Sequence, residues 1–425
     1  MEKKIGNLFK GDKGIWTVFL FLCLISIVEV FSASSTLTYK THNYMMPLIY
    51  HTAMILVGVV VAIFILNIPC RYFKLLTPMM LVLTYATLLW VLIGGESING
   101  ANRVIQLPGF TFQPSEIAKG TMVLTAAQIL SAMQREDESG ADPTAMKYVL
   151  WLVVPATMLI GLENLSTAVL LFSVIFVMMF IARVPLKQMG KLTGVLVLLV
   201  ALFLGLVFWM AKLDKEGQEL EQAQANGQTE QVVKSTEKKD RSGWEKLTHR
   251  FWTWKNRIAG KDDKNVSAEE YKVTDKNFQV THANFAIASS GIIGKGPGNS
   301  VERDYLPQAF SDFIYAIIIE EMGLLGAIAV VFLYVILLFR AARIASRCEN
   351  NFPAFLVLGL TLLLVFQAVI NMCVAVDFGI VTGQPLPLIS KGGTSTIVNC
   401  AYIGVILSVS RSAKRKDQTV KTAEV

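Results

Sequence analysis

"LPQAFSDFIYAIIIEE", residues 306–321, is the stretch that decides the class of this protein. It is an apolar run with one carboxylate, Asp312, near its start and two more, Glu320 and Glu321, at its end. With a helical rise of about 1.5 Å per residue, the two glutamates lie roughly 12–14 Å along the helix from Asp312. A charge at that depth in a membrane is costly and is normally paired or functional. The stretch therefore predicts a membrane helix that carries a functional site.

Composition places the whole chain in the membrane class. Of its 425 residues, 53% are hydrophobic and 17% are charged, and the mean hydropathy is +0.50. Soluble domains carry about 25% charged residues. The net charge of +7 would suggest nucleic acid as a partner of a soluble protein, but here it follows membrane topology, so no nucleic acid is expected. The five cysteines and four histidines show neither disulfide nor metal-ligand spacing.

The apolar segments predict ten transmembrane helices, because a bilayer core needs about 20 residues per helix. They lie near 15–33, 47–67, 74–94, 115–133, 147–161, 165–182, 192–212, 311–340, 353–376 and 394–411. Lys and Arg concentrate in alternate connections, which predicts that both termini are cytoplasmic. We therefore expect an all-α polytopic membrane protein with a large extracytoplasmic loop between helices 7 and 8.

We interpret residues 1–425 as a single membrane domain with two appended segments. One is the extracytoplasmic loop 213–310, of which 213–276 is polar and is expected to be mobile or peripheral. The other is the cytoplasmic tail, 412–425. Within the loop, residues 244–258 place apolar side chains on one helical face. That helix lies on the outer membrane leaflet or caps the membrane domain, and the sequence leaves both interpretations open.

Three polar segments rich in Gly and Pro fall on the expected outer side. They are "GANRVIQLPGFTFQPSEIAKG" (100–120), "SSGIIGKGPGNSVERDYLPQAFSD" (289–312) and "VTGQPLPLISKGGTS" (381–395). Irregular backbone near a membrane is tolerated where protein buries it or where it lines a wet cavity. We therefore expect the three segments to meet around one cavity. The glycines around Lys295 could cradle phosphate oxygens through backbone N–H groups, although most such loops are ordinary turns.

The spacing of charged residues predicts specific pairs. Glu116 and Lys119 are three residues apart, so they can pair on one helix face. Glu320 and Glu321 need cations at their depth in the membrane. Arg103 and Lys119 are the expected partners, because they are the outward-side cations nearest to them in the predicted topology.

Taken together, these segments and "YLPQAFSDFIYAIIIEEMGLLG" (305–326) resemble the SEDS family (shape, elongation, division and sporulation), the FtsW/RodA-type enzymes. The likeness spans nearly the whole chain, in order. It implies a peptidoglycan glycosyltransferase that polymerises lipid II at the outer face of the cytoplasmic (inner) membrane. The chain is more similar to FtsW, which serves division, than to RodA, which serves elongation. The resemblance also implies a class B penicillin-binding protein (transpeptidase) and other divisome or elongasome proteins as partners.

The resemblance implies that Asp312, in "SDF", is the catalytic residue. The residues expected to bind substrate, from the resemblance and the patterns above, are Arg103, Gln113, Ser115, Glu116, Lys119, Lys295, Asp304, Glu320, Glu321, Ser390, Gly392, Gly393 and Ser395. No dedicated metal ligands are expected, although a divalent cation, Mg²⁺ or Mn²⁺, could assist.

The chain departs from the family pattern at three places. It has Val104 where the family has Trp, Lys391 where it often has Tyr, and Gln-Ala-Phe at 308–310 where it often has Glu-Ala-His. None of these departures removes the carboxylate. They bear on how the substrate is held.

The expected reaction is a single inverting displacement. Asp312 would take the proton of the attacking sugar hydroxyl, and general-base help of this kind contributes about 10²–10⁴-fold. Arg103, Lys119 and, with less support, Lys295 would stabilise the leaving lipid diphosphate. Two alternatives stay open: a lipid II flippase, and a scaffold in which the carboxylates are buried struts.

Overall fold

The computed structural model describes residues 10–34, 45–94, 96–98, 101–107, 110–136, 140–202, 205, 273, 277–306, 309–379 and 381–423. The chain divides into two compact units, Met1–Pro185 with Phe278–Val425, and Leu186–Asn277. In the second unit, residues 186–202 are helical. The helix predicted at 244–258 lies outside the described residues, and only residue 273 of the loop 213–276 is described.

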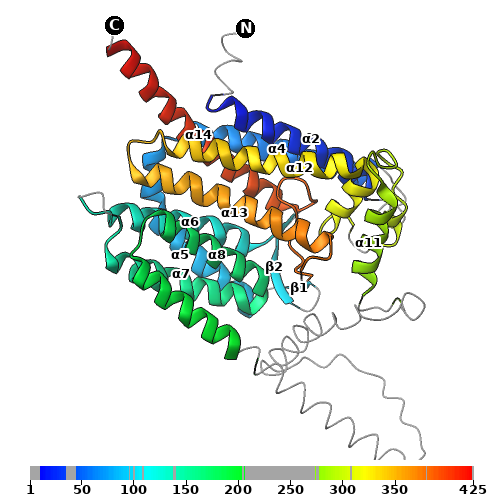
Figure 1. Cartoon of the computed structure of the whole chain (residues 1–425), viewed down its shortest axis with the longest axis horizontal. Helices are drawn as coiled ribbons and strands as arrows, with labels where there is room; N and C mark the ends of the chain where they lie inside the picture. Colours follow the sequence, from blue (N-terminus) through cyan, green and yellow to red (C-terminus); the bar gives the residue numbers. More distant parts are fainter. Residues whose placement is uncertain are drawn as a thin grey trace, which may run out of the picture. The chain divides into compact units, whose positions relative to one another are not determined.

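The first unit is helical (Figure 1). Its helices are α2 (Lys13–Ser32), α4 (Met45–Leu66), α5 (Cys70–Gly94), α6 (Pro114–Ala132), α7 (Pro143–Glu163), α8 (Leu165–Ile181), α11 (Phe278–Ser290), α12 (Ile314–Ala345), α13 (Asn351–Ala375) and α14 (Thr394–Ala423). Among the described residues, seven helices are long and apolar enough to cross a membrane, and α8 is a shorter apolar helix. The multi-pass class is confirmed, whereas ten crossings and cytoplasmic termini remain predictions.

The predicted segments coincide with helices, with local differences. Nine of them fall on α2, α4 to α8 and α12 to α14, and the seventh, 192–212, overlaps the described helix at 186–202. Helix α12 begins at Ile314 rather than at 311, so Asp312 precedes the helix and its N-cap residue, Phe313. Helix α11 was not predicted as a separate element.

The all-α expectation is wrong between α5 and α6. This connection forms a three-stranded antiparallel sheet, β1 (Glu96–Ile98), β2 (Ala101–Leu107) and β3 (Phe110–Phe112), in the order β1-β2-β3. Ile105 pairs with Phe112 across β2 and β3. Backbone N–H and C=O groups need hydrogen-bond partners, and in this connection the paired strands provide them for one another.

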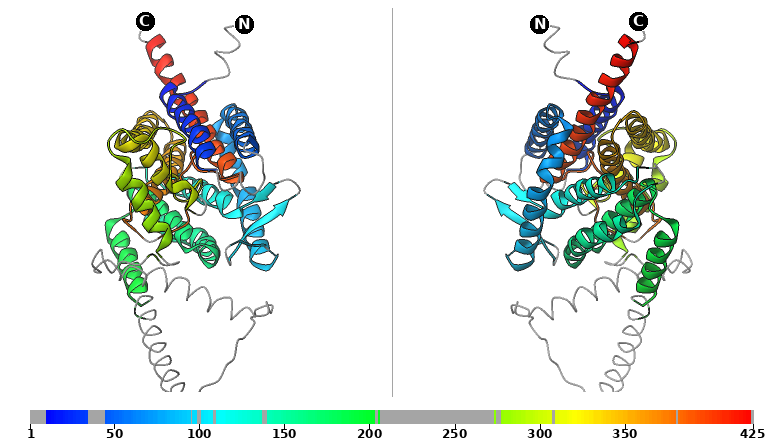
Figure 2. Two further views of the ribbon diagram at one scale, coloured as in Figure 1. Left: turned by 90° about the vertical axis from the view of Figure 1, so that its right-hand side faces the viewer. Right: turned by 90° about the vertical axis from the view of Figure 1, so that its left-hand side faces the viewer.

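Helix α13 lies in the core of the unit. Two-thirds of its apolar stretch (67%) is buried, the same share as for α14, compared with 22% for α4 and for α5. It packs against α6, α8, α12 and α14, while α14 also packs against α4 (Figure 2). The peripheral helices expose large apolar side chains such as Phe64 and Val82. That exposure suits lipid rather than water.

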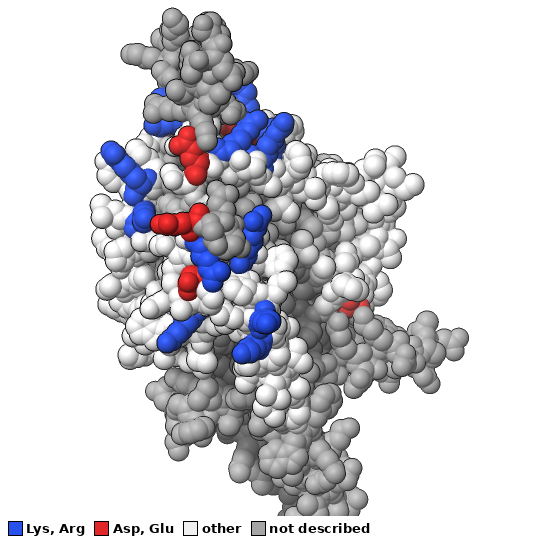
Figure 3. Space-filling model, turned by 60° about the vertical axis from the view of Figure 1, so that its left-hand side comes forward, with Lys and Arg blue, Asp and Glu red and all other residues white. Residues whose placement is uncertain are grey.

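Basic side chains gather on one face of the molecule (Figure 3). Separately, hydrogen bonds join the ends of several helices. Arg340 donates to both carboxylate oxygens of Asp12, at 2.8 and 2.6 Å, and the Asp12 N–H donates to Ser410 Oγ at 2.8 Å. These bonds join the start of α2, the end of α12 and α14. The arrangement agrees with the Lys and Arg asymmetry along the sequence.

Helix α12 is interrupted at Gly323, whose φ of +67° and ψ of −168° lie outside the helical region. The loop after α11 supplies the hydrogen bonds that the break removes. They are Lys295 N–H to Glu320 O (3.0 Å), Gly296 N–H to Glu321 O (2.8 Å), Leu324 N–H to Gly291 O (3.3 Å) and Leu325 N–H to Ile292 O (3.3 Å). A Cβ on Gly323 would lie 2.3 Å from Ile292 O, so only glycine fits.

Candidate active site

Asp312 lies in the turn that leads into α12. Its side chain is partly exposed, and its Oδ1 accepts a hydrogen bond from Ser311 Oγ at 2.9 Å. The backbone of Gly383 runs beside it, because a Cβ built there would lie 3.5 Å from Asp312 Oδ2. The carboxylate therefore lies where two of the three polar segments come together.

The backbone of this turn is held at three consecutive carbonyl oxygens. Phe310 O accepts from the Lys391 N–H at 2.9 Å, Ser311 O from Ser390 Oγ at 2.6 Å and Asp312 O from Asn371 Nδ2 at 2.8 Å. Two of the donors belong to the segment 381–395 and the third to α13. The turn is thus fixed from two sides, while none of these bonds uses the carboxylate.

The first polar segment joins the same assembly. Thr394 Oγ1 donates to Thr111 O at 2.9 Å. Lys119 Nζ donates to Gln367 Oε1 at 2.7 Å, and Gln367 Nε2 donates to Pro385 O at 2.9 Å. The predicted convergence of the three segments is confirmed at the level of contacts. The cavity between them remains a prediction.

The predicted pair on α6 is confirmed. Lys119 Nζ lies 2.9 Å from Glu116 Oε1, and the exposed fractions of the two side chains are 0% and 4%. Glu116 Oε2 has no hydrogen-bond partner among the described residues. The side chain of Lys119 is thus fully buried, and its ammonium group is bound to Glu116 and Gln367.

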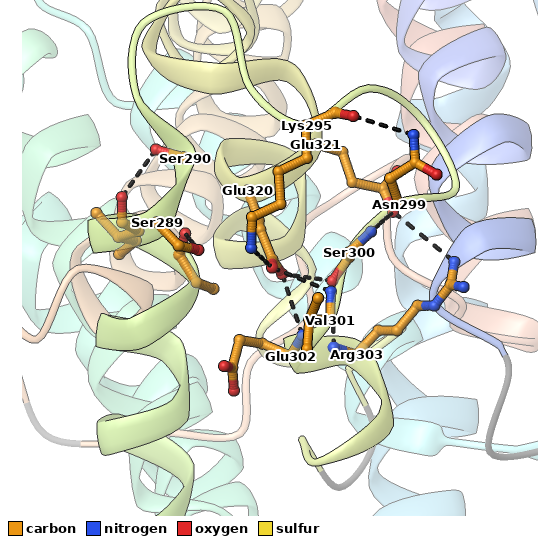
Figure 4. A network of polar contacts seen from close by, with 12 residues as sticks. Ser289, Ser290, Lys295, Asn299, Ser300, Val301, Glu302, Arg303, Glu320 and Glu321 are labelled. Carbon is orange, nitrogen blue, oxygen red and sulfur yellow. Dashed lines mark hydrogen bonds and ion pairs between the residues drawn. The ribbon is translucent and has the colours of Figure 1, made fainter.

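Glu320 and Glu321 are completely buried beneath the loop 295–303 (Figure 4). Glu320 accepts from Lys295 Nζ (2.6 Å), Ser300 Oγ and the N–H groups of Val301 (3.0 Å) and Glu302 (3.3 Å). Glu321 accepts from Ser32 Oγ and from the N–H groups of Gly298 (3.0 Å) and Ser300 (3.2 Å). We call this set of contacts the acidic nest.

The acidic nest changes two expectations. The glycine-rich loop does cradle anions through its N–H groups, but the anions it holds are the chain's own carboxylates. The pairing of Lys119 with Glu320 or Glu321 is wrong, because Lys295 binds Glu320 and Arg303 Nη1 lies 4.0 Å from Glu321 Oε1. Arg103 belongs to β2, and its side chain lies outside the described atoms.

The other predicted site residues shape the ends of helices. Gln113 is the N-cap residue of α6, and its Nε2 donates to Ser115 Oγ at 3.1 Å. Ser395 Oγ donates to Gly392 O at 2.8 Å, and Gly393, with a φ of +51°, directly precedes α14.

Asp304 ends the short 3₁₀ helix η2 (Glu302–Asp304) and is exposed. Ser390 is buried and also accepts from the Leu386 N–H at 2.7 Å.

Two polar residues of α13 that bind the polar segments were missed by sequence reasoning. Gln367 and Asn371 are polar residues four apart in the apolar run of α13, and polar residues at such positions are functional candidates. Lys391, noted above as a departure from the family pattern, also lies beside the Asp312 turn. Its Nζ lies 5.0 Å from the centroid of the Phe310 ring, and burial lowers the pKa of its ammonium group. No group of three or more His, Cys, Asp or Glu that could hold a metal ion occurs among the described residues.

A model of the family described as "Cell cycle protein", which covers FtsW, RodA and SpoVE, matches residues 12–236 and 249–415. The chain belongs to this family. Two curated members with a similar sequence are each named probable peptidoglycan glycosyltransferase FtsW. The one from Halomonas elongata is 28% identical over 94% of this chain and 91% of its own length. The one from Hahella chejuensis is 29% identical over 94% and 90%.

Solved structures share the fold of this family member. One is a chain of a peptidoglycan synthase complex described as coordinating polymerization and crosslinking, with a TM-score of 0.67, 21% identity and coverage of 95% of this chain and 99% of that chain. Another is the rod shape determining protein RodA of Thermus thermophilus, with a TM-score of 0.60, 21% identity and coverage of 95% and 98%.

Proposed function

We propose that this chain is a peptidoglycan glycosyltransferase that polymerises lipid II into glycan strands at the outer face of the cytoplasmic membrane. Its family and the names of its curated relatives support the reaction class. The single observation that carries the assignment of the site is the partly exposed Asp312 carboxylate on a backbone that is bonded at three carbonyl oxygens. A septal role in cell division is favoured by the FtsW relatives, and elongation is the alternative.

Asp312 is the proposed general base. It removes the proton from the sugar hydroxyl as that oxygen attacks the anomeric carbon of the other substrate. The bond from that carbon to the lipid diphosphate breaks in the same step, with inversion. A base on a rigid turn keeps the reacting atoms aligned. Alignment of this kind lowers the activation barrier by several kcal/mol, up to about 7–11 kcal/mol.

The leaving diphosphate needs cationic groups, and the contacts bear on which are available. Lys119 is enclosed and bound to Glu116, so its proposed role is to hold α6 to α13 rather than to contact phosphate. Lys391 is half-buried next to the Asp312 turn and forms no ion pair among the described residues, so we add it to Arg103 and Lys295 as a candidate. A cation enclosed near the bond that breaks stabilises developing charge strongly.

The remaining predicted positions are assigned supporting roles. We propose that Glu320 and Glu321 act through the acidic nest, by holding the loop 295–303 against the break in α12. Gln113, Ser115, Gly392, Gly393 and Ser395 shape the entrances to α6 and α14. A divalent cation remains part of the expectation for the substrate's diphosphate, and no step of the mechanism depends on it.

The proposed topology has ten transmembrane helices, with both termini in the cytoplasm and Asp312 on the outer side. The basic residues Arg340 and Arg343, near the end of α12 that is far from Asp312, support this orientation. A class B penicillin-binding protein is the proposed partner, together with other divisome or elongasome proteins. The likeness to a chain of a peptidoglycan synthase complex supports a partnered state.

A polymerisation assay separates the enzyme from its rivals. Purified protein is incubated with lipid II in detergent, with and without a class B penicillin-binding protein, and the products are resolved by length. We expect glycan polymers, with a higher yield when the partner is present. A lipid II flippase needs a sealed bilayer and forms no new bond, so monomeric lipid II as the sole product would contradict the polymerase. A scaffold would likewise give no polymer.

A further inference from the structure

The amide of Asn371 connects the two polar segments beside Asp312. Its Nδ2 donates to Asp312 O and to Gln384 O, each at 2.8 Å. Both partners are carbonyl oxygens, which only accept hydrogen bonds, so the nitrogen of the amide must face them. The Asn371 side-chain nitrogen therefore donates both of its hydrogens, and the two hydrogen bonds join the Asp312 turn to the segment 381–395.

The position of Asn371 makes this connection rigid. Asn371 is 1% exposed and belongs to α13, a core helix of the unit. The segment 381–395, which Asn371 binds through Gln384 O, is also bound to α8, because Gln384 Nε2 donates to Thr167 Oγ1 at 2.7 Å. A side chain on a rigid helix, supported by a second layer of bonds, holds a site to within fractions of an ångström.

The amide is retained at an energetic cost. Asn371 Oδ1 is buried and has no hydrogen-bond partner among the described residues. An unsatisfied buried carbonyl lowers the stability of the fold. A leucine, whose side chain has a similar branched shape, would avoid that penalty but would lose both donated bonds. The placement of the Asp312 turn therefore explains what the amide contributes better than core packing does.

We infer that Asn371 is a positioning residue for the glycosyl transfer, and that Ser390 shares this role. Asn371 fixes the carbonyl of Asp312, and Ser390 fixes the preceding carbonyl of Ser311. Neither bond uses the carboxylate oxygens of Asp312. Both residues therefore fix the position of the carboxylate and leave its oxygens able to accept a proton. This inference rests on the proposed function, because the carboxylate that is positioned is the proposed general base.

The inference predicts a loss of turnover without a loss of substrate binding. Misplacement of a reacting group by about 1 Å can lower a rate about 100-fold. Asn371→Leu should therefore lower kcat for lipid II polymerisation by about 10–100-fold, while KM changes less than about threefold, because the groups that bind the saccharide and diphosphate are untouched. Ser390→Ala should show the same pattern with a smaller loss.

The test uses the purified full-length chain with lipid II in detergent, and thermal unfolding to confirm that each variant is folded. Asn399→Leu is the matched control, since Asn399 is also buried on a membrane helix with an unpartnered Oδ1 and none of the hydrogen bonds described for the Asp312 turn reaches it. The control should keep kcat within about twofold. If Asn371→Leu fails to fold, Ser390→Ala carries the test alone.

Failure of the inference can be told apart from failure of the proposed function. If Asp312→Ala is inactive but folded variants at 371 and 390 keep the parental kcat, the positioning role is overturned and the base assignment stands. An increase in KM alone, or an equal loss of kcat in Asn399→Leu, would also overturn it. If Asp312→Ala polymerises lipid II at the parental rate, the proposed base itself is wrong.

Discussion

Two buried glutamates of this chain differ sharply in their surroundings. Glu321 receives bonds from Ser32 and from two N–H groups of the acidic nest, with Arg303 nearby. Glu29, on α2, is equally buried, but neither of its carboxylate oxygens has a hydrogen-bond partner among the described residues. The described contacts therefore stabilise the carboxylate of Glu321, whereas none of them does so for Glu29.

This difference predicts opposite responses to the same substitution. Glu321→Gln should lower the free energy of unfolding by about 1–3 kcal/mol, because the new amide N–H groups would face donors. Glu29→Gln removes no hydrogen bond formed among the described residues, so its stability should stay within about 1 kcal/mol of the parent. Thermal unfolding of the purified proteins in detergent measures both. Equal destabilisation by the two substitutions would show that the contacts of the acidic nest do not stabilise the fold.

At the scale of elements, the break in α12 is the feature that organises the site. The loop 291–296 replaces the missing helical bonds, and the carboxylates just before the break bind the rest of the loop. Gly294 and Gly323 allow the two backbones to approach, since a Cβ on either would lie 2.3 Å from a carbonyl oxygen. The broken helix and its loop therefore form one structural unit.

We predict that Gly323→Ala destabilises the protein by at least about 2 kcal/mol, because alanine at positive φ is strained and its Cβ would collide with Ile292 O. Lipid II polymerisation should fall with the displaced loop. Gly190→Ala is the control, since Gly190 lies in a helix and nothing is within 4 Å of a Cβ built there. Chemical unfolding compares the two variants. A parental stability for Gly323→Ala would mean that the break is not built as described.

At the scale of the whole molecule, much of the architecture could be predicted from the sequence. Long apolar runs announce membrane helices wherever they occur, and the three polar segments stood out by their Pro and Gly content. Local pairs such as Glu116 and Lys119 follow from helical spacing. Partners distant in the sequence could not be predicted in this way. Lys295 pairs with Glu320 across the break in α12 at Gly323. Neither hydrophobic periodicity nor the charge pattern reveals that break.

The proposed orientation predicts which sites face outward. Ile293 is 78% exposed in the loop after α11, and Ser346 is exposed beyond the end of α12. In a background without the five native cysteines, a membrane-impermeant maleimide added to intact cells should label Ile293→Cys. Ser346→Cys should react only after the membrane is permeabilised. Labelling of Ser346→Cys from outside would reverse the orientation and place Asp312 on the cytoplasmic side.

The most direct measurement is the rate of lipid II polymerisation by purified Asp312→Asn in detergent. The change keeps the shape of the side chain and removes its ability to accept a proton, so we predict a loss of at least about 100-fold, with thermal unfolding and lipid II binding unchanged. Glu349→Gln, at an exposed carboxylate beyond the far end of α12, should keep the parental rate. Glycan polymers formed by Asp312→Asn at the parental rate would contradict the account.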